Sequence, residues 1–209
     1  FSATMPVSVE KLTRKYLHNP VTVTIGDVGG TAKIDIEQRI EFIKSEKDKR
    51  GLLLDVISAT AFPAIVFVNS KRSADFVGQT LDAFGYRVIV LHSGKMQDKR
   101  EEAIRSFKAG KSDILVATDV AGRGIDIAGV QHVINYDMAK NIEDYMHRIG
   151  RTGRAGLSGL ATSFVNLADE DSNIMSDLRK FLQQAKQYIP EELTHHDHKR
   201  KRDSTIYIA

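Results

Sequence analysis

The feature that most constrains the fold is a regular alternation of short apolar runs with amphipathic segments. Residues 64–68, Ala-Ile-Val-Phe-Val, form a continuous apolar run, which is typical of a strand covered on both faces. Similar runs occupy 86–91, 113–117, 130–135 and 161–165, and helical patterns begin near Ser70, Gln97 and Asn141 and after residue 170. This order predicts an α/β fold with a parallel sheet and helices on both faces, in which ligands bind at the carboxyl ends of strands.

The first 60 residues have a weaker pattern. Their predicted elements are a helix with the apolar stripe Val9, Leu12, Tyr16 and Leu17, ended by Asn19-Pro20, then a strand over 21–25, a loop over 26–33, an edge strand over 34–42 and a helix over 47–59. We expect one domain over residues 1–189 and a C-terminal extension over 190–209. The basic run 195–202 in this extension is interpreted as a solvated tail, with a nuclear-import or RNA-contacting patch as the alternative.

Composition excludes several classes of protein. The chain has 209 residues, no cysteine and a net charge of +3, so disulfides and cysteine-based zinc sites are excluded. No apolar run approaches the roughly 20 residues that span a bilayer, and we expect no membrane association. A polyanion site must therefore come from locally clustered cations. Because the sequence opens at Phe1 without a methionine, we expect a piece of a longer protein.

One such cluster is the glycine-punctuated stretch His147-Arg148-Ile149-Gly150-Arg151-Thr152-Gly153-Arg154. A helix is predicted from Asn141, whose side chain can cap free backbone N–H groups, to about Gly150. Three arginines without an acid among them repel one another unless a polyanion lies between them, and guanidinium groups suit phosphate oxygens. A solvated basic turn is the alternative.

Two further candidates follow predicted strands. The segment 118–126, Thr-Asp-Val-Ala-Gly-Arg-Gly-Ile-Asp, offers backbone N–H groups and Arg123 to a phosphate, and Asp126 to sugar hydroxyls. Its alternative is a glycine-rich connection with Asp119 as a helix cap. Gln97 and Arg100 lie in the first turn of another predicted helix, where ordinary surface polarity is the alternative.

The chain lacks the parts of a self-contained ATPase. Gly110-Lys111-Ser112 resembles the end of a phosphate-binding loop, but position 105, which must be glycine in that pattern, is Arg105. No paired carboxylates follow a strand where they could hold magnesium, and we predict no metal site. The sequence supplies cations for phosphate without the lysine, magnesium ligand or base of a hydrolase.

Five motifs in register resemble the DEAD-box RNA helicases. They are Ser2-Ala3-Thr4, Ile65–Asn69, Gln97–Arg100, Ala117–Asp126 and Tyr145–Arg154. The match covers almost the whole chain and corresponds to the second RecA-like lobe, with residues 1–6 as the remnant of the interlobe motif. Residues 135–145 and 204–209 look most like the spliceosomal branch of the family, which works with the U5 snRNP at the 5′ splice site. That implies pre-mRNA splicing and a nuclear location.

The resemblance implies a role for each matching residue. ATP with Mg²⁺ would be held mainly by an absent N-terminal lobe, with Arg151 and Arg154 reaching the γ-phosphate, His147 linking the lobes, and Gly124 and Asp126 on the nucleotide. RNA or its supporting network would be contacted by Asn69, Gln97, Arg100, Thr118 and Arg123. Ser2 and Thr4 would couple hydrolysis to strand separation. Gly122 stands where many members have alanine, which does not change these assignments.

The resemblance therefore implies an ATP-dependent RNA helicase whose isolated C-terminal lobe is inactive and monomeric. Its implied partners are RNA, the N-terminal lobe and spliceosomal proteins. The alternative functions are an RNA-binding scaffold without ATPase coupling and DNA translocation in a related helicase family. The scaffold hypothesis gives Arg151, Arg154 and Asp126 no role.

Overall fold

The computed structural model describes residues 7–21, 23, 36–119, 127, 129–153, 158–166 and 172–194. The chain divides into two compact units, Phe1–Ile34 and Asp35–Ala209. The domain boundaries predicted from the sequence, 1–189 and 190–209, stay predictions.

In the first unit, helix α1 spans Val7–Tyr16, as its apolar periodicity predicts. The stripe is not buried, because Leu12, Tyr16 and Leu17 are each more than half exposed. The predicted strand over 21–25 and the loop over 26–33 lie almost entirely outside the described residues.

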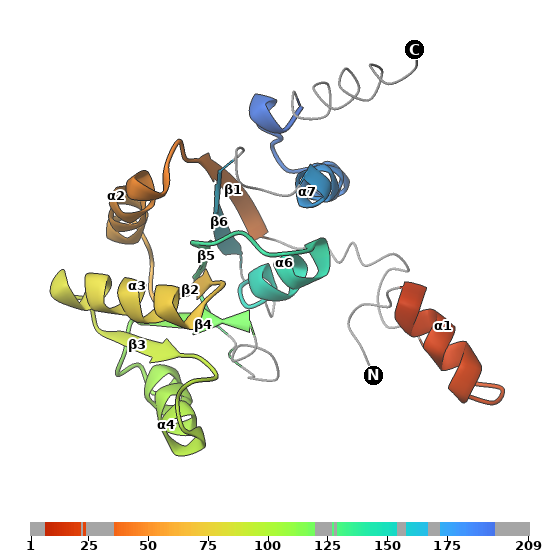
Figure 1. Ribbon diagram of the computed structural model, residues 1–209, viewed down its shortest axis with the longest axis horizontal. Coiled ribbons are helices and arrows are strands. Elements are labelled where there is room, and N and C mark those ends of the chain that lie inside the picture. The colour runs from red at the N-terminus through yellow and green to blue at the C-terminus, as the bar shows by residue number, and fades with distance from the viewer. Residues whose placement is uncertain are drawn as a thin grey trace, which may run out of the picture. The chain divides into compact units, whose positions relative to one another are not determined.

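The second unit is built on a parallel sheet, shown in Figure 1. Its described strands are β1 (Ile36–Phe42), β2 (Ala64–Val68), β3 (Val88–Leu91), β4 (Ile114–Thr118), β5 (His132–Asn135) and β6 (Gly159–Val165), in the order β1-β6-β5-β2-β4-β3. All neighbouring pairs are parallel. The predicted α/β fold is therefore confirmed, and β1 is an edge strand as its alternation of buried and exposed residues predicts.

Helices cover both faces of this sheet. They are α2 (Glu46–Ser58), α3 (Lys71–Ala83), α4 (Gln97–Lys108), α6 (Ile142–Ile149) and α7 (Ser172–Gln184). Figure 1 shows α2 and α3 on one side of the sheet and α6 and α7 on the other. Alternate side chains of β2 point to opposite faces of the sheet. Val66 and Val68 join the core formed with α2 and α3, whereas the Phe67 ring lies under Arg148 of α6.

The described part of the C-terminal extension is packed against the second unit. Pro190 and Leu193 are buried, and just before them the Gln187 side chain accepts the backbone N–H of Gln38 on β1 at 3.1 Å. The first residues of the extension, 190–194, are therefore packed rather than solvated, because Leu193 has apolar surface to bury. The basic run 195–202 lies outside the described residues. None of the helices described is long and apolar enough to cross a membrane.

Candidate functional site

The predicted basic stretch begins on helix α6, at the carboxyl ends of the central strands. Asn141 is extended and its side chain accepts the backbone N–H of Asp144 at 2.8 Å. This is the cap predicted from the sequence, and it satisfies one of the free N–H groups of the first turn. Tyr145, Arg148 and Ile149 are the buried residues of the helix. Their spacing of three and four places Arg148 within the stripe that faces the sheet.

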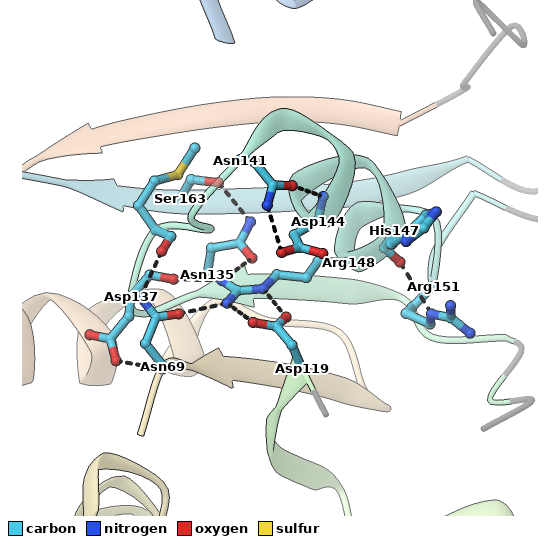
Figure 2. Close-up of polar contacts among 11 residues, drawn as sticks. Asn69, Asp119, Asn135, Asp137, Asn141, Asp144, His147, Arg148, Arg151 and Ser163 are labelled. Carbon is cyan, nitrogen blue, oxygen red and sulfur yellow. Dashed lines mark hydrogen bonds and ion pairs between the residues drawn. The ribbon is translucent and has the colours of Figure 1, made fainter. Parts of the chain in front are cut away.

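Arg148 is the centre of the site, although only 2% of its surface is exposed. Its Nε and Nη2 donate to the two carboxylate oxygens of Asp119 at 2.6 and 2.7 Å. Nη2 also donates to Asn69 Oδ1 at 2.7 Å, and Nη1 donates to the Asp137 carbonyl at 2.6 Å. Asn69, Asp119 and Asp137 follow β2, β4 and β5, so one guanidinium joins the ends of three strands (Figure 2).

This geometry corrects one interpretation. Arg148 belongs to the three arginines expected to face a polyanion, but its charge is neutralised inside the protein by Asp119. Asp119, interpreted as part of a phosphate-binding loop or as a helix cap, is the bidentate partner of that arginine. Charge-assisted pairs of this kind are the strongest and most directional hydrogen bonds in proteins, so Arg148 is a structural cation and the phosphate-facing set loses one member.

Buried polar side chains continue from Arg148 toward the edge of the sheet. Arg148 Nη1 lies 3.4 Å from Asn135 Oδ1, and Asn135 Nδ2 donates to Ser163 Oγ at 2.9 Å. Tyr145 donates its hydroxyl to Gln38 Oε1 at 2.9 Å, and burial raises the pKa of this phenol. Helix α6 is therefore held over the sheet by specific polar contacts as well as by apolar packing.

A second cation, Lys49 of α2, supports the same strand ends. Its ammonium lies 3.1 Å from Asp137 Oδ1 and 2.8 Å from Glu46 Oε1. Burial alone would lower the pKa of Lys49, but the hydrogen bonds and charges of Glu46 and Asp137 outweigh burial and hold that pKa above its ordinary value. The other carboxylate oxygen of Asp137 accepts the Asn69 backbone N–H at 2.9 Å. This fixes the turn that follows β2.

Arg151 and His147 lie to one side of the Arg148 cluster, and their side chains point away from it in Figure 2. Both are partly exposed. Arg151 Nε donates to the His147 carbonyl at 3.2 Å, which holds the side chain near the end of α6. The structure thus brings together His147 and Arg151, two of the five residues predicted for the ATP site.

The predicted RNA residues occupy two different environments. Gln97 is exposed in the first turn of α4, and its Oε1 accepts from Arg100 Nη1 at 3.0 Å. Thr118 is buried at the end of β4. Asn69 uses Oδ1 for Arg148 and donates Nδ2 to the Met138 carbonyl at 2.9 Å. This geometry favours the supporting role for Asn69 over direct contact with RNA.

Several predicted residues lie outside the part of the chain that the structure describes. They are Ser2, Thr4, Gly122, Arg123, Gly124, Asp126 and Arg154. Within the described part, no group of three or more acidic or histidine side chains could hold a metal ion.

Sequence reasoning placed Arg148 among the phosphate-facing arginines, although two signals pointed to a structural role. Asn69, Asp119 and Asp137 each come one or two residues after a predicted strand, and parallel strands end at one edge of a sheet. Arg148 has the helical spacing of a buried residue between Tyr145 and Ile149. A cation at an apolar position above three polar strand ends is best explained by an internal ion pair.

Residues 48–156, more than half of the chain, match the family described as the helicase conserved C-terminal domain. The chain belongs to this family. The RecA-like lobe and the DEAD-box resemblance expected from the sequence are confirmed by the relatives described next.

Among curated proteins, the chain is 48% identical over 200 residues to the pre-mRNA-splicing ATP-dependent RNA helicase PRP28 of Coccidioides immitis. It is 50% identical over 199 residues to DEAD-box ATP-dependent RNA helicase 21 of Oryza sativa subsp. japonica. Each match covers 94% of this chain but only 24% and 26% of the relative. The chain thus spans about a quarter of the length of these relatives.

Two solved structures are similar throughout. The helicase Prp28 from Chaetomium thermophilum, bound to ADP, has a TM-score of 0.68 and 40% identity, covering 92% of this chain and 46% of that one. The yeast DEAD-box splicing factor Prp28 has a TM-score of 0.75 and 32% identity, covering 94% and 44%. This helicase C-terminal domain therefore corresponds to less than half of either structure.

Proposed function

We propose that the chain is the C-terminal lobe of an ATP-dependent DEAD-box RNA helicase that opens short RNA duplexes. The observation that carries the proposal is the difference between two arginines at the end of α6. Arg148 forms a buried ion pair with Asp119, whereas the Arg151 side chain is partly exposed and points away from that pair. A guanidinium so placed, on a chain without a phosphate-binding loop, suits a nucleotide that another lobe holds.

In this function Arg151 and Arg154 stabilise negative charge that develops on the γ-phosphate, as arginine fingers do. His147, Gly124 and Asp126 complete this lobe's side of the ATP site. The described residues offer guanidinium and backbone donors but no carboxylate set for a cation, which fits a site where Mg²⁺ is held by the N-terminal lobe. The two arginines would reach the γ-phosphate only when the lobes close, so ATP binding energy is used for closure.

RNA would be bound through its backbone. Gln97 is exposed at the start of α4 and accepts a hydrogen bond from the Arg100 guanidinium. Arg123 would add a second positive charge for the RNA backbone. Asn69 and Thr118 would support these residues rather than contact RNA themselves. Contacts to phosphate and sugar make binding tolerant of sequence and sensitive to salt.

The place of action is inferred from the relatives. One of the relatives described above is named a pre-mRNA-splicing helicase, and one of the solved proteins is named a splicing factor. These names support the proposal that the protein acts in the nucleus, with RNA, its own N-terminal lobe and spliceosomal proteins as partners. We also propose that it acts as a monomer.

The test is RNA-stimulated ATPase activity of the full-length protein with Arg151→Ala or Arg154→Ala. Loss of one arginine finger is expected to lower kcat by about 10³-fold while leaving RNA binding without nucleotide unchanged. Arg50→Ala, an exposed arginine of α2, is the matched control and should retain the parent rate. Unchanged ATPase in both Arg151 and Arg154 variants would favour the scaffold.

A further inference from the structure

Gly159, the first residue of β6, lies against the turn that follows α6. A Cβ atom at this position would overlap Thr152 Oγ1, and it would lie 2.5 Å from Gly153 N and 2.7 Å from Thr152 Cγ2. Real Cβ atoms do not approach other heavy atoms this closely, and one of the obstacles is backbone. The two segments can meet in this way only because residue 159 has no side chain.

Thr152 is fixed on its other side and cannot retreat cheaply. It is 2% exposed, and its hydroxyl donates to the Val130 carbonyl and lies 3.3 Å from the Gln131 carbonyl. The Gln131 carbonyl also accepts the backbone N–H of Leu160 at 3.2 Å. Thr152 is therefore pinned between the segment that leads into β5 and the start of β6.

The fixed turn separates the two arginines of the proposed ATP site. Thr152 N donates to the Ile149 carbonyl at 3.0 Å, which continues the course of α6. Gly153 then takes φ of +64°, a left-handed conformation that favours glycine. Arg151 precedes this pair of residues and Arg154 follows it, so a shift of the turn moves both arginine backbones.

We propose that Gly159 and Thr152 are positioning residues for ATP hydrolysis. They touch neither nucleotide nor RNA, and they act by setting the path of the chain between Arg151 and Arg154. This inference rests on the proposed function, because it assigns these residues an effect on ATP through the two arginines.

The experiment uses the full-length protein with Gly159→Ala and with Gly78→Ala as its matched control. A Cβ atom on Gly78 of α3 would overlap the side chain of Val90 on β3, so this variant also disturbs buried packing, but away from the arginine turn. ATPase rates are measured against ATP concentration at saturating RNA. RNA binding without nucleotide and the thermal midpoint are measured on the same preparations.

We expect Gly159→Ala to lower kcat/KM for ATP by about tenfold or more, since displacement of about 1 Å can cost 10²-fold. Its RNA binding without nucleotide should match the parent. Gly78→Ala should lower the thermal midpoint but keep the parent kcat/KM. A parental kcat/KM in Gly159→Ala, or an equal loss in Gly78→Ala, would overturn the proposal.

A second pair of variants decides the matter if Gly159→Ala does not fold. Thr152→Val keeps the shape of the side chain but loses the hydroxyl that pins the turn, whereas Thr152→Ser keeps the hydroxyl. The valine variant should lose ATPase and the serine variant should recover most of it; equal activity in the two contradicts the proposal. If Arg151→Ala and Arg154→Ala both keep full ATPase, the proposed function fails, whereas loss in these two variants with none in the Gly159 and Thr152 variants refutes only the positioning role.

Discussion

Arg148 holds a full positive charge where solvent reaches almost none of its surface. Such a charge is tolerated because the planar guanidinium meets two carboxylate oxygens, an amide oxygen and a backbone carbonyl at once. The Phe67 ring lies beneath it, 5.3 Å from the guanidinium carbon, and adds a cation–π contact. A lysine ammonium is a compact point charge and cannot match this set of partners.

Arg148→Lys is therefore expected to destabilise the fold even though the charge is kept. Asp119 and Asn69 would lose well-aligned donors in a buried site, at a cost of about 3 kcal/mol. The measurement is urea unfolding of the chain followed by far-UV circular dichroism, because the sequence has no tryptophan. Arg50→Lys on the surface of α2 is the control, and equal midpoints for the two variants would show that the fork geometry is unimportant.

His132 makes stability depend on pH. The ring is buried between the hydroxyls of Thr60 and Thr162, at 2.9 and 2.8 Å. Burial, with a smaller contribution from the charge of Arg39, lowers the pKa of His132 from 6.5 to about 4. Between these pH values the unfolded chain binds the proton more readily, so this contribution to stability is complete above about pH 6.5 and is lost as pH falls toward 4.

The loss amounts to at most about 3 kcal/mol. The free energy of unfolding is measured from pH 7 to pH 4.5 for the parent and for His132→Asn, which cannot titrate there. Because carboxylates contribute equally to both proteins, the difference between the two curves should fall with decreasing pH. A constant difference would mean that His132 is not held neutral by burial.

At the scale of elements, Gly51 is a weak point of helix α2. It lies in the helix interior, and a Cβ atom added there would meet nothing within 4 Å. Gly51→Ala should stabilise the protein by about 1 kcal/mol and raise the thermal midpoint by about 2–4 °C.

Gly85 provides the contrast, since it also has open space around its Cβ position but takes φ of +86°. Gly85→Ala should destabilise by about 1 kcal/mol, because alanine is strained there. Differential scanning calorimetry distinguishes the two variants, and a midpoint that falls in Gly51→Ala would contradict this account of α2.

The elements were predictable because their local signals and tertiary roles agree. The apolar run 64–68 can be covered on both faces only inside a parallel sheet, and Ser70 and Asn141 cap their helices as expected. The strand order was not predictable, because periodicity does not say which strands become neighbours. The ion pair of Arg148 with Asp119 joins residues 29 positions apart, and local spacing alone could not distinguish it from a polyanion site.

At the scale of the whole molecule, we propose that this lobe carries half of an ATP site. Arg151 and His147 stand at the end of α6, on a lobe whose described residues lack the carboxylate cluster of a metal site, and whose sequence lacks a phosphate-binding loop. The PRP28 relative is about four times as long as this chain. A protein of that length has room for a second lobe that would carry the other half of the ATP site. The arginines would complete the site only when both lobes close.

Steady-state ATP hydrolysis by the 209-residue chain, compared with the full-length protein at saturating RNA, tests this claim most directly. The account predicts RNA-stimulated turnover by the full-length protein and none above background by the chain alone. Sustained RNA-stimulated turnover by the purified chain, abolished by Arg151→Ala in that same chain, would contradict it, because the ATP site would then be complete within this lobe.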